Sequence, residues 1–560
     1  MRVLIFHGYL LDGTGSNVYN ARLAAALVRL GHDVHLLSQD RRPERQSFVD
    51  AIADWDAGSL QVRDLGSAGG EGGGRLGDSG RASDDGHAGE SEHAGRGRCT
   101  VYRPDIGGLL PVYVADRYEG IEARTFAQCS EAEVARYIDA NVAAVAEVLA
   151  LTRAQVALAN HLVMGPVILA RALDGAIPYA VKVHGSALEY TVKPQPERFL
   201  APAREGLAAA TAVLVGSRHT AESLWRALED PELPRRTRLG PPGVDVERFA
   251  PREPEQAAAG LRALAARMRA QAVAAPGPGG GEEGASGGEG SDGFARDAGA
   301  AASALAQVDP HRDALVAFVG KLIVSKGVDL LLAAWPLVLE QVPHARLVIV
   351  GFGAYRDGLE RLRAALIDGE LEAAREIALA GRTLEGEPPP APPLHHLLAF
   401  LDGLADGERE RYLRAARGLE QRMLLTGRLD HTELADLLPA CEAVVVPSTF
   451  PEAFGMVAAE AAACGALPVS AAHSGLAEVS TTLARAVPAT AAVWLSFEVD
   501  DQAVRSLATA LIGGLQADPA TRARTRAGLV ATVRERWSWE GVARGVIAAA
   551  QGQLDALPEP

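Results

Sequence analysis

Residues 447–460, with the sequence PSTFPEAFGMVAAE, carry two carboxylates whose spacing suggests chemistry. Glu452 lies in a predicted loop after a strand, and Glu460 lies inside the alanine-rich helix that follows. A helix that begins after Phe454 and Gly455 offers free backbone amides and a positive dipole end to a phosphate. A loop carboxylate can accept hydrogen bonds from sugar hydroxyls, and one deeper in the helix can hold a ribose. An ordinary capped helix with two solvated glutamates is the alternative interpretation.

Two lysines lie close together in the segment FVGKLIVSKGVD, residues 318–329. Lys321 and Lys326 fall in a short loop between a predicted strand and a predicted helix, where two cations can neutralise a pyrophosphate without a metal ion. The chain has only four lysines among its 55 basic residues, so each is a candidate for a task that arginine performs poorly. A solvated charge pair is the alternative here.

Polar residues also follow two predicted strands of the first half of the chain. In VKVHGSALEY (residues 181–190) the strand ends at His184, and alternation places Lys182 and His184 on one face. A lysine in a buried strand is costly unless it is paired. Asn160 and His161 likewise come just after a strand. We expect these residues near a ligand, with a purely structural histidine as the alternative.

A glycine turn, GTGS at residues 13–16, follows the first predicted strand. There Gly15 would let the backbone approach a phosphate. The turn lacks the complete GxGxxG fingerprint of dinucleotide-binding folds.

Strands and helices must alternate to position these residues. The periodicity predicts strands at 3–6, 32–37, 156–159, 179–183, 212–216, 315–319, 346–350, 444–446 and 467–470, with helices at 18–30 and 328–340 among the connections. This pattern predicts an α/β protein with open parallel sheets, whose ligands bind at the carboxyl ends of the strands. Two such series indicate two Rossmann-like domains that face a central cleft.

Domain boundaries follow from this pattern and from composition. We expect an N-terminal domain over residues 1–245, a C-terminal domain over 246–536, and a final helix over 537–560 that crosses back to the first domain. The glycine-rich segments 66–98 and 274–299 predict disordered insertions, because they bury too little apolar surface to offset ordering entropy. Prolines at 388–393 predict a stiffer interruption. The helical patch 355–421 has no assigned task.

Composition excludes several classes of protein. The net charge of the 560 residues is −16, which argues against a protein that binds a nucleic-acid backbone. No apolar run reaches the ~20 residues of a membrane span, and the first apolar run is too short for a signal peptide. The four cysteines are far apart, so we expect neither disulfides nor a zinc site. These features predict a cytoplasmic protein.

Together the motifs resemble the GT-B glycosyltransferases, most closely the retaining nucleotide-sugar enzymes of family 4. Glu452 and Glu460 are similar to the E-x7-E pair of that family, and Lys321 and Lys326 to its R-x4-K pair with lysine in place of arginine. PPGVDVERF (residues 241–249) is similar to the interdomain segment, with Pro242 where asparagine is usual. WSWEGVA (residues 537–543) is similar to the start of the closing helix.

The resemblance implies an enzyme that transfers a hexose from a nucleoside diphosphate sugar and retains the anomeric configuration, with no metal and no further cofactor. It implies that Glu460 binds the ribose and that Lys321, Lys326 and Gly15 bind the diphosphate. Glu452 and the backbone of Phe454, Gly455 and Met456 would orient the hexose, Val457 would be a further donor-binding residue, and His184 would lie near the anomeric carbon. Arg428, in TGRLDH after a predicted strand, would lie beside the nucleobase.

The acceptor side is open. Lys182 and Lys193 flank His184, which predicts an acceptor with a phosphate or carboxylate group, and Asn160 and His161 belong to the same side. The acceptor class would be a small molecule, a glycan or a lipid-linked sugar, and peripheral membrane contact stays open. The alternatives for the whole protein are an epimerase or phosphorylase of the same fold, a catalytically silent sugar-nucleotide-binding protein, and a dehydrogenase.

Overall fold

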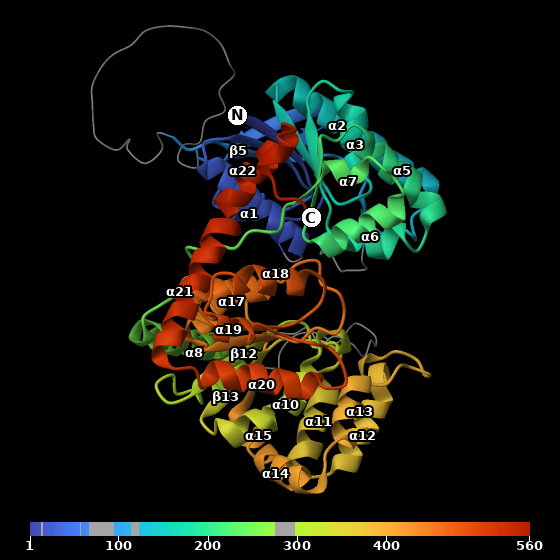
Figure 1. The fold of residues 1–560 in the computed structure, drawn as a ribbon. Helices are drawn as coiled ribbons and strands as arrows, with labels where there is room; N and C mark the ends of the chain where they lie inside the picture. Colours follow the sequence, from blue (N-terminus) through green and yellow to red (C-terminus); the bar gives the residue numbers. More distant parts are fainter. Residues whose placement is uncertain (13–14, 57, 67–94, 114–121, 275–296) are drawn as a thin grey trace, which may run out of the picture. The chain divides into compact units, whose positions relative to one another are not determined.

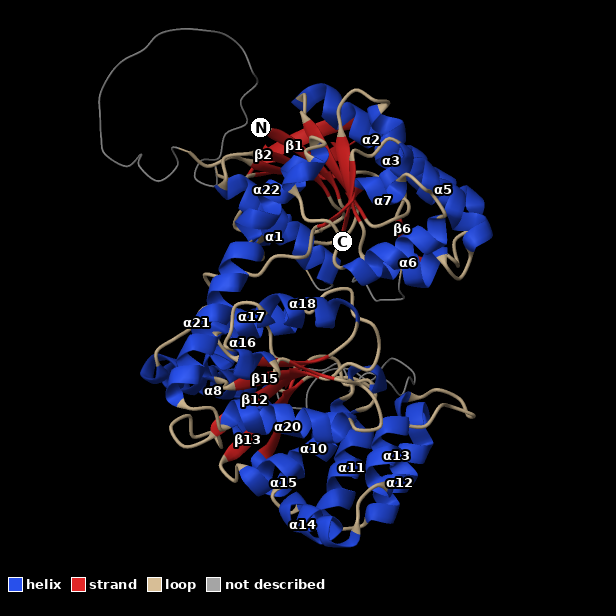
Figure 2. Ribbon diagram, viewed as in Figure 1, coloured by secondary structure: helices blue, strands red, loops and turns tan. Residues whose placement is uncertain are grey.

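The computed structural model of the chain describes residues 1–12, 15–56, 58–66, 95–113, 122–274 and 297–560. It divides into two compact units: unit 1 comprises Met1–Gly243 with Trp539–Pro560, and unit 2 comprises Val244–Ser538. The predicted boundaries after residue 245 and before residue 537 lie two residues from these. Each unit contains a sheet with helices packed against it (Figure 2).

The large sheet of unit 1 has the strand order β11-β10-β9-β8-β1-β2-β5-β3-β4 among the described residues. Its neighbouring strands are parallel except for the antiparallel pair of β3 and β4. The strands are β1 (Arg2–Phe6), β2 (Asp33–Leu37), β3 (Ala51–Asp56), β4 (Ser59–Asp64), β5 (Cys99–Arg103), β8 (Val156–Asn160), β9 (Tyr179–Lys182), β10 (Ala212–Val215) and β11 (Thr237–Leu239). A small parallel pair, β6 (Leu109–Val112) and β7 (Glu122–Thr125), lies apart from this sheet.

Alternation along the strands gives unit 1 a core on each face of its sheet. In β1, Val3 and Ile5 belong to one core, and Leu4 and Phe6 to the other. Both faces are apolar because helices cover both, as parallel sheets require. These helices are α1 (Gly15–Arg29), α2 (Glu131–Thr152), α3 (Gly165–Leu173), α4 (Gly185–Ala187), α5 (Pro196–Ala208), α6 (Arg218–Leu228), α7 (Leu233–Arg236) and α22 (Trp539–Ala550).

The last helix of the chain, α22, belongs to unit 1 and packs beside α1 (Figure 1). Trp539 at its start is 5% exposed and lies against Gly243, where an added Cβ would meet the indole at 2.5 Å. Arg29 of α1 forms an ion pair with Glu540 at 2.7 Å. Residues from the two ends of the chain thus complete one core.

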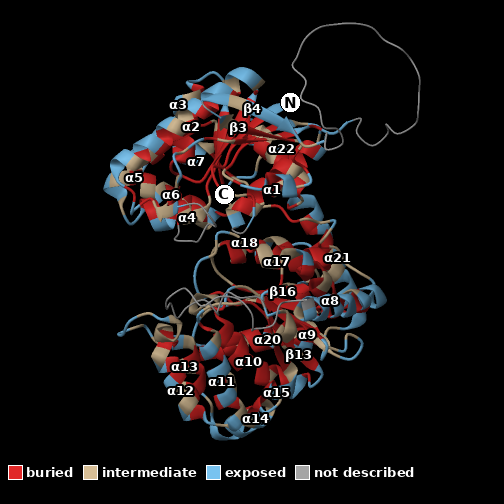
Figure 3. Ribbon diagram, turned by 180° about the vertical axis from the view of Figure 1, so that it is seen from behind, coloured by how far each residue is buried: buried red, intermediate tan, exposed pale blue. Residues whose placement is uncertain are grey.

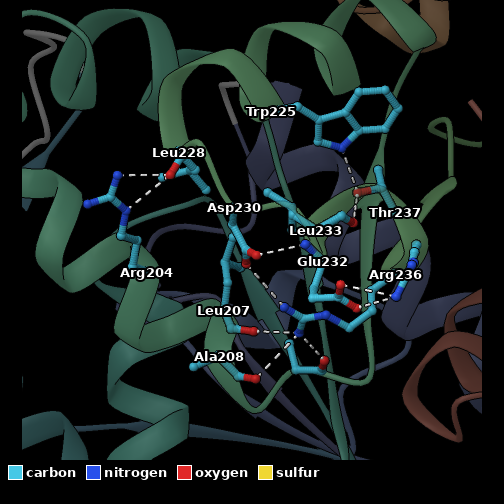
Figure 4. Close-up of polar contacts among 12 residues, drawn as sticks. Arg204, Leu207, Ala208, Trp225, Leu228, Asp230, Glu232, Leu233, Arg236 and Thr237 are labelled. Carbon is cyan, nitrogen blue, oxygen red and sulfur yellow. Dashed lines mark hydrogen bonds and ion pairs between the residues drawn. The ribbon is translucent and has the colours of Figure 1, made fainter.

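Side-chain bonds to main-chain carbonyls hold the end of the unit 1 sheet at β11 (Figure 4). The Trp225 indole N–H donates to Thr237 Oγ1 at 2.9 Å, and that hydroxyl donates to the Leu233 carbonyl at 2.7 Å. The Arg204 guanidinium donates to the Leu228 carbonyl at the end of α6. These bonds satisfy carbonyls at helix ends and fix α6 and α7 against the sheet.

Unit 2 contains a parallel sheet with the order β14-β13-β12-β15-β16-β17 among its described strands. The strands are β12 (Ala314–Val319), β13 (Ala345–Val350), β14 (Met423–Gly427), β15 (Ala443–Val446), β16 (Leu467–Ala471) and β17 (Ser496–Phe497). β12 and β15 are neighbours, so the loops that leave their carboxyl ends lie side by side. This adjacency positions the site described below.

Helices cover the unit 2 sheet, and α10 is almost wholly buried (Figure 3). Its Trp335 is 0% exposed. The helices are α8 (Pro254–Ala274), α9 (Ala298–Leu305), α10 (Val328–Gln341), α11 (Arg356–Asp368), α12 (Leu371–Ala380), α13 (His395–Asp402), α14 (Asp406–Ala416), α15 (Leu419–Arg422), α16 (His431–Leu437), α17 (Met456–Cys464), α18 (Ser474–Ala484), α19 (Ala489–Ala492), α20 (Ala503–Leu515) and α21 (Pro519–Arg536). None of the described helices is both long and apolar enough to cross a membrane.

The structure corrects one expected strand, adds elements that the sequence did not predict, and leaves most of the two glycine-rich segments undescribed. The strand expected to reach His184 ends at Lys182. The hairpin of β3 and β4 and the strand β5 were not predicted. Most of the segments 66–98 and 274–299 lies outside the described residues, but their ends are part of the fold: the Gly97 amide donates to the Val28 carbonyl at 2.9 Å, and residues 298–299 begin α9.

Candidate active site

The site in unit 2 centres on an ion pair between two neighbouring loops. Lys326 ends a 3-10 turn, Val324–Lys326, which follows β12, and Glu452 lies in the loop that follows β15. The Lys326 ammonium contacts Glu452 Oε1, and the Ser448 hydroxyl donates to the same oxygen at 2.9 Å. The Lys326 side chain is 30% exposed and that of Glu452 is 24% exposed. The pair therefore remains open to an incoming ligand.

Main-chain bonds hold these two loops together. The Ser325 carbonyl accepts from the Thr449 amide at 2.9 Å and from the Ser448 hydroxyl at 3.0 Å. Gly327 has φ +64°, and a Cβ there would lie 2.0 Å from the Pro447 carbonyl oxygen, so only glycine fits. The loop geometry that joins Lys326 to Glu452 is thus fixed by the backbone.

The start of α18 holds Glu452 from its other side. The Glu452 amide donates to Ser474 Oγ at 2.9 Å, and the Gly475 amide donates to the Glu452 carbonyl at 2.9 Å. The ring of His473 reaches the Ser448 carbonyl through Nε2 at 2.7 Å. Sequence reasoning missed Ser448, His473 and Ser474, whose only signal is their position just after β15 and β16.

The N-terminus of α17 follows four residues after Glu452 and is suited to an anion. Its N-cap, Gly455, makes no side-chain capping bond, and a Cβ there would crowd Leu476 at 2.9 Å. Met456 and Val457 are partly exposed, and among the described residues their amides have no hydrogen-bond acceptor. Phe454 packs edge-on against Trp537, with ring centroids 5.4 Å apart. The N-terminus of α17 thus presents unbonded amides, and the phosphate site predicted there stays a prediction.

Glu460 lies one turn deeper in α17 and is 5% exposed. Its Oε1 accepts from His431 Nε2–H at 2.7 Å, and the His431 ring packs against Phe249 with centroids 4.7 Å apart. His431 begins α16 and was not predicted, although it stands at the end of the TGRLDH segment that gave Arg428. The contact fixes one carboxylate oxygen and leaves the other for a ligand.

Arg428 and Lys321 lie near the same edge of the sheet. Among the described residues, neither forms a hydrogen bond or ion pair with the Lys326–Glu452 pair or with the Glu460–His431 pair. Arg428 follows β14, lies over the Phe352 ring at 5.6 Å and is 3.9 Å from Asp430. Lys321 follows β12 and is exposed. The structure thus brings together Lys326 with Glu452 and, separately, Glu460 with His431. The roles predicted for Lys321 and Arg428 stay predictions.

Unit 1 contains a chain of hydrogen bonds at the carboxyl ends of β1, β8 and β9. His184 Nε2–H donates to Asn160 Oδ1 at 3.0 Å, and Asn160 Nδ2 donates to Asn20 Oδ1 at 2.7 Å. Asn20 Nδ2 donates to His7 Nδ1 at 3.0 Å, and His7 Nε2–H donates to the Leu10 carbonyl at 2.8 Å. This order fixes the tautomers and leaves His184 Nδ1 to accept a hydrogen bond. His7 and Asn20 were not predicted.

Burial favours the neutral form of three imidazoles near the carboxyl ends of these strands, those of His7, His161 and His184. Burial lowers the pKa of His7 to about 4 and holds the pKa values of His161 and His184 well below the usual range. His161 packs on the Tyr113 ring at 4.3 Å, and neither of its ring nitrogens has a hydrogen-bond partner among the described residues. Gly15 begins α1, is exposed and has open space where a Cβ would point, while residues 13–14 lie outside the described residues.

The two lysines predicted on the acceptor side both have partners. Lys182 is 2% exposed, donates to the Gly240 carbonyl at 2.6 Å and lies over the Tyr19 ring at 5.6 Å, and burial lowers its pKa to about 7. Lys193 pairs with Glu189 at 2.7 Å and also donates to Ser223. An anionic acceptor bound by these lysines would have to displace these contacts, and it stays a prediction.

Family models match most of the chain. The glycosyl transferase 4-like domain matches residues 14–232, and two models of the glycosyl transferases group 1 match residues 313–391 and 397–507.

Two curated relatives are 28% identical to parts of the chain. One is a D-inositol 3-phosphate glycosyltransferase from Xylanimonas cellulosilytica, matched over 65% of this chain and 63% of its own length. The other is a GDP-mannose-dependent monoacylated alpha-(1-6)-phosphatidylinositol monomannoside mannosyltransferase from Corynebacterium glutamicum, matched over 40% and 44%. The chain therefore spans less than two thirds of the length of each.

Solved structures share the fold. A sucrose-phosphate synthase from Thermosynechococcus elongatus has a TM-score of 0.51 at 18% identity, covering 99% of both chains. The N-terminal domain of trehalose-6-phosphate phosphatase from Candida albicans also reaches 0.51, at 11% identity and over 98% of this chain and 97% of that one. These likenesses show the GT-B fold, with α/β units built on parallel sheets.

Proposed function

Because the chain belongs to the group 1 and 4-like glycosyl transferases, we propose that it transfers a sugar from a nucleoside diphosphate sugar to an acceptor. The observation that carries this proposal is the Lys326–Glu452 pair, four residues before the uncapped N-terminus of α17. A cation, a carboxylate and free amides at one sheet edge are what a sugar diphosphate needs. We propose retention of the anomeric configuration and transfer without a metal ion, as the family resemblance implies.

In this proposal, binding of the donor breaks the ion pair between Lys326 and Glu452. The diphosphate replaces Glu452 at the Lys326 ammonium and receives the amides of Met456 and Val457. Glu452, released from Lys326, accepts hydrogen bonds from hydroxyls of the sugar. Lys326 thus exchanges one anionic partner for another, and hydroxyls of the sugar replace Lys326 at Glu452, so neither charged group is left without a partner.

The transfer step breaks the bond between the anomeric carbon and the diphosphate oxygen. The acceptor oxygen forms the new bond on the same face of the sugar, and a phosphate oxygen takes the proton that the acceptor loses. Negative charge on the leaving diphosphate grows during this step. Lys326 and the first-turn amides of α17 therefore bind the transition state more tightly than the ground state.

The Glu460–His431 pair is the proposed ribose site. Glu460 accepts the ribose hydroxyls on the carboxylate oxygen that His431 does not hold. A buried carboxylate with one fixed oxygen presents a rigid acceptor and loses little side-chain entropy when it binds. Arg428, over the Phe352 ring, is the proposed neighbour of the nucleobase.

Unit 1 is the proposed acceptor unit. His184 Nδ1, left as an acceptor by the hydrogen-bond chain, suits a hydroxyl group of an acceptor or sugar. The names of the two curated relatives indicate inositol 3-phosphate and a phosphatidylinositol mannoside as their substrates. We therefore include inositol phosphates among the acceptors to test.

A thermal-shift screen across UDP-, GDP- and ADP-sugars, followed by mass spectrometry of the products, tests the proposal. We expect one nucleotide series to stabilise the protein and a glycosylated acceptor to form. An epimerised sugar nucleotide without acceptor, or phosphate-dependent cleavage of a disaccharide, would instead establish the epimerase or the phosphorylase. Stabilisation by NAD alone would contradict the assignment altogether.

A further inference from the structure

A pocket of about 230 Å³ lies in unit 2 between the N-terminal ends of α10 and α13. Its walls are Val324, Asp329, Leu330, Pro393, Leu394, His395, His396, Leu397 and Thr449. Lys326, Glu452 and Glu460 do not line it. One wall comes from the helical patch between β13 and β14, to which the sequence assigned no task.

Two polar atoms at this pocket lack partners. Asp329 is 4% exposed, and its Oδ1 is buried with no hydrogen bond to any described residue. His396 Nδ1 is likewise buried and unpartnered. Burial raises the pKa of Asp329 to about 7. A buried polar atom without a hydrogen bond is unfavourable, so a ligand that reached these atoms and supplied partners would be stabilised.

The lining narrows the chemistry of such a ligand. No lysine or arginine lines the pocket, and Asp329 disfavours an anion. The described residues contain no cluster of three histidine, cysteine or acidic side chains that could hold a metal ion. Leucine, valine and proline supply apolar walls, while Asp329, the two histidines and Thr449 supply hydrogen bonds. This mixture suits a neutral molecule with an apolar ring face and hydroxyls at its edge.

The volume of the pocket indicates the size of the ligand. A protein cavity of about 150 Å³ accepts benzene, so a pocket of about 230 Å³ has room for one substituted six-membered ring. We propose that this pocket is a second binding site, for one neutral polyhydroxylated ring such as a monosaccharide or a cyclitol.

The pocket also contacts the two loops of the active site. Val324 begins the turn that ends at Lys326, and its amide donates to Glu385 Oε2 at 2.8 Å. Thr449 belongs to the loop of Glu452, and its amide binds the Ser325 carbonyl. An occupant of the pocket therefore braces both loops, so nucleotide should bind more tightly when the ring is present.

Binding of D-glucose, D-mannose and myo-inositol, measured by saturation-transfer NMR and calorimetry at millimolar concentrations, tests the proposal. This binding test does not depend on the proposed transferase activity. We expect one of the three compounds to bind, and to remain bound when UDP or GDP is saturating. Failure of all three, or displacement by the nucleotide, overturns the second site.

Two variants locate the binding. Asp329→Asn keeps the shape of the side chain, and His396→Phe keeps a ring on a partly exposed helix. We therefore expect at least one variant to be folded, which its thermal unfolding curve checks. Each should weaken ring binding about tenfold. Asp329→Asn replaces a carboxylate oxygen, which accepts a hydrogen bond, with an amide nitrogen, which only donates, and His396→Phe removes both ring nitrogens. His311→Phe, an exposed residue elsewhere in unit 2, is the matched control. Equal affinity in the wild type and both variants would overturn the assignment to this pocket.

Discussion

The four lysines of this chain have four different environments, and only one of them forms an ion pair in the unit 2 site. Lys326 contacts Glu452 there, whereas Lys193 pairs with Glu189 on a helix surface and Lys182 is buried in a strand. The ammonium of lysine is a compact point charge, unlike the broad guanidinium fork of arginine. The structure gives Lys326 a carboxylate partner, and its role in binding a ligand stays a prediction.

Lys326→Ala should reduce donor turnover about 10²–10³-fold, because it removes one charge that stabilises the leaving diphosphate. Steady-state rates with the nucleotide sugar found in the screen measure this loss. Arg361→Ala is the control, since Arg361 is an exposed cation of α11 in the same unit and should leave the rate unchanged. Wild-type turnover in Lys326→Ala would remove Lys326 from the chemistry.

His431→Ala should raise the dissociation constant for a nucleoside diphosphate about tenfold, because Glu460 loses the bond that holds it. His431→Gln can still donate to Glu460 and should recover part of that affinity. Isothermal calorimetry with UDP or GDP compares the three proteins. If the His431→Ala and His431→Gln variants bind the nucleotide as tightly as the wild type, the ribose site lies elsewhere.

At the residue scale, sequence reasoning found side chains that carry their own signal. Lys326 and Glu452 follow strands, and Glu460 lies in the helix after Glu452 at a recognisable spacing. His431 and Ser474 matter through contacts with distant segments, such as the 2.9 Å bond from the Glu452 amide to Ser474. Nothing in the local sequence specifies such contacts, because the order of strands in the sheet creates them.

Elements were predictable where a single period dominated. β1, β12 and α10 match their predicted spans closely, because buried parallel strands are continuous apolar runs and α10 is apolar on nearly every side. The β3–β4 hairpin was missed because its second strand, SLQVRD, is largely exposed and mixes charge with isolated apolar residues. Its place comes from pairing with β3, which no local pattern shows.

Packing of α22 against the rest of unit 1 contributes to the stability of that unit. Trp539→Ala should destabilise unit 1 by about 3–5 kcal/mol, because it empties a buried site beside Gly243. Hydrogen–deuterium exchange of the full chain locates the effect. Amides of β8, β9 and β10 should lose protection while those of β12 and β15 keep theirs.

Trp55→Ala is the matched control for this experiment, since Trp55 lies partly exposed on β3. It should cost much less stability, and it should leave exchange in β8 to β10 unchanged. Uniform loss of protection across both units in Trp539→Ala would show that α22 is no part of unit 1.

For the molecule as a whole, the buried imidazoles of unit 1 set an acid limit. His7, His161 and His184 have pKa values lowered by burial, so below about pH 6.5 the unfolded chain binds protons that the folded chain cannot. The free energy of unfolding should therefore fall as pH falls from 6.5 toward 4. The slope is about 1.4 kcal/mol per pH unit for each histidine.

His161→Phe tests this linkage, because His161 makes no hydrogen bond with described residues and phenylalanine keeps the ring. Urea unfolding at pH 7.5, 6 and 5 should show a smaller loss of stability in the variant than in the wild type. Comparison between the two proteins cancels other titrating groups, including Asp329, whose raised pKa acts in the opposite direction. Parallel curves would refute the neutral state of His161.

The central claim is that a sugar diphosphate binds at Lys326 and the start of α17. A crystal structure of the chain with the nucleoside diphosphate that stabilises it most tests this directly. We expect diphosphate oxygens within hydrogen-bond distance of Lys326 Nζ and the amides of Met456 and Val457, with Glu452 released and the ribose on Glu460. A nucleotide bound elsewhere, with the Lys326–Glu452 pair intact, would contradict the account.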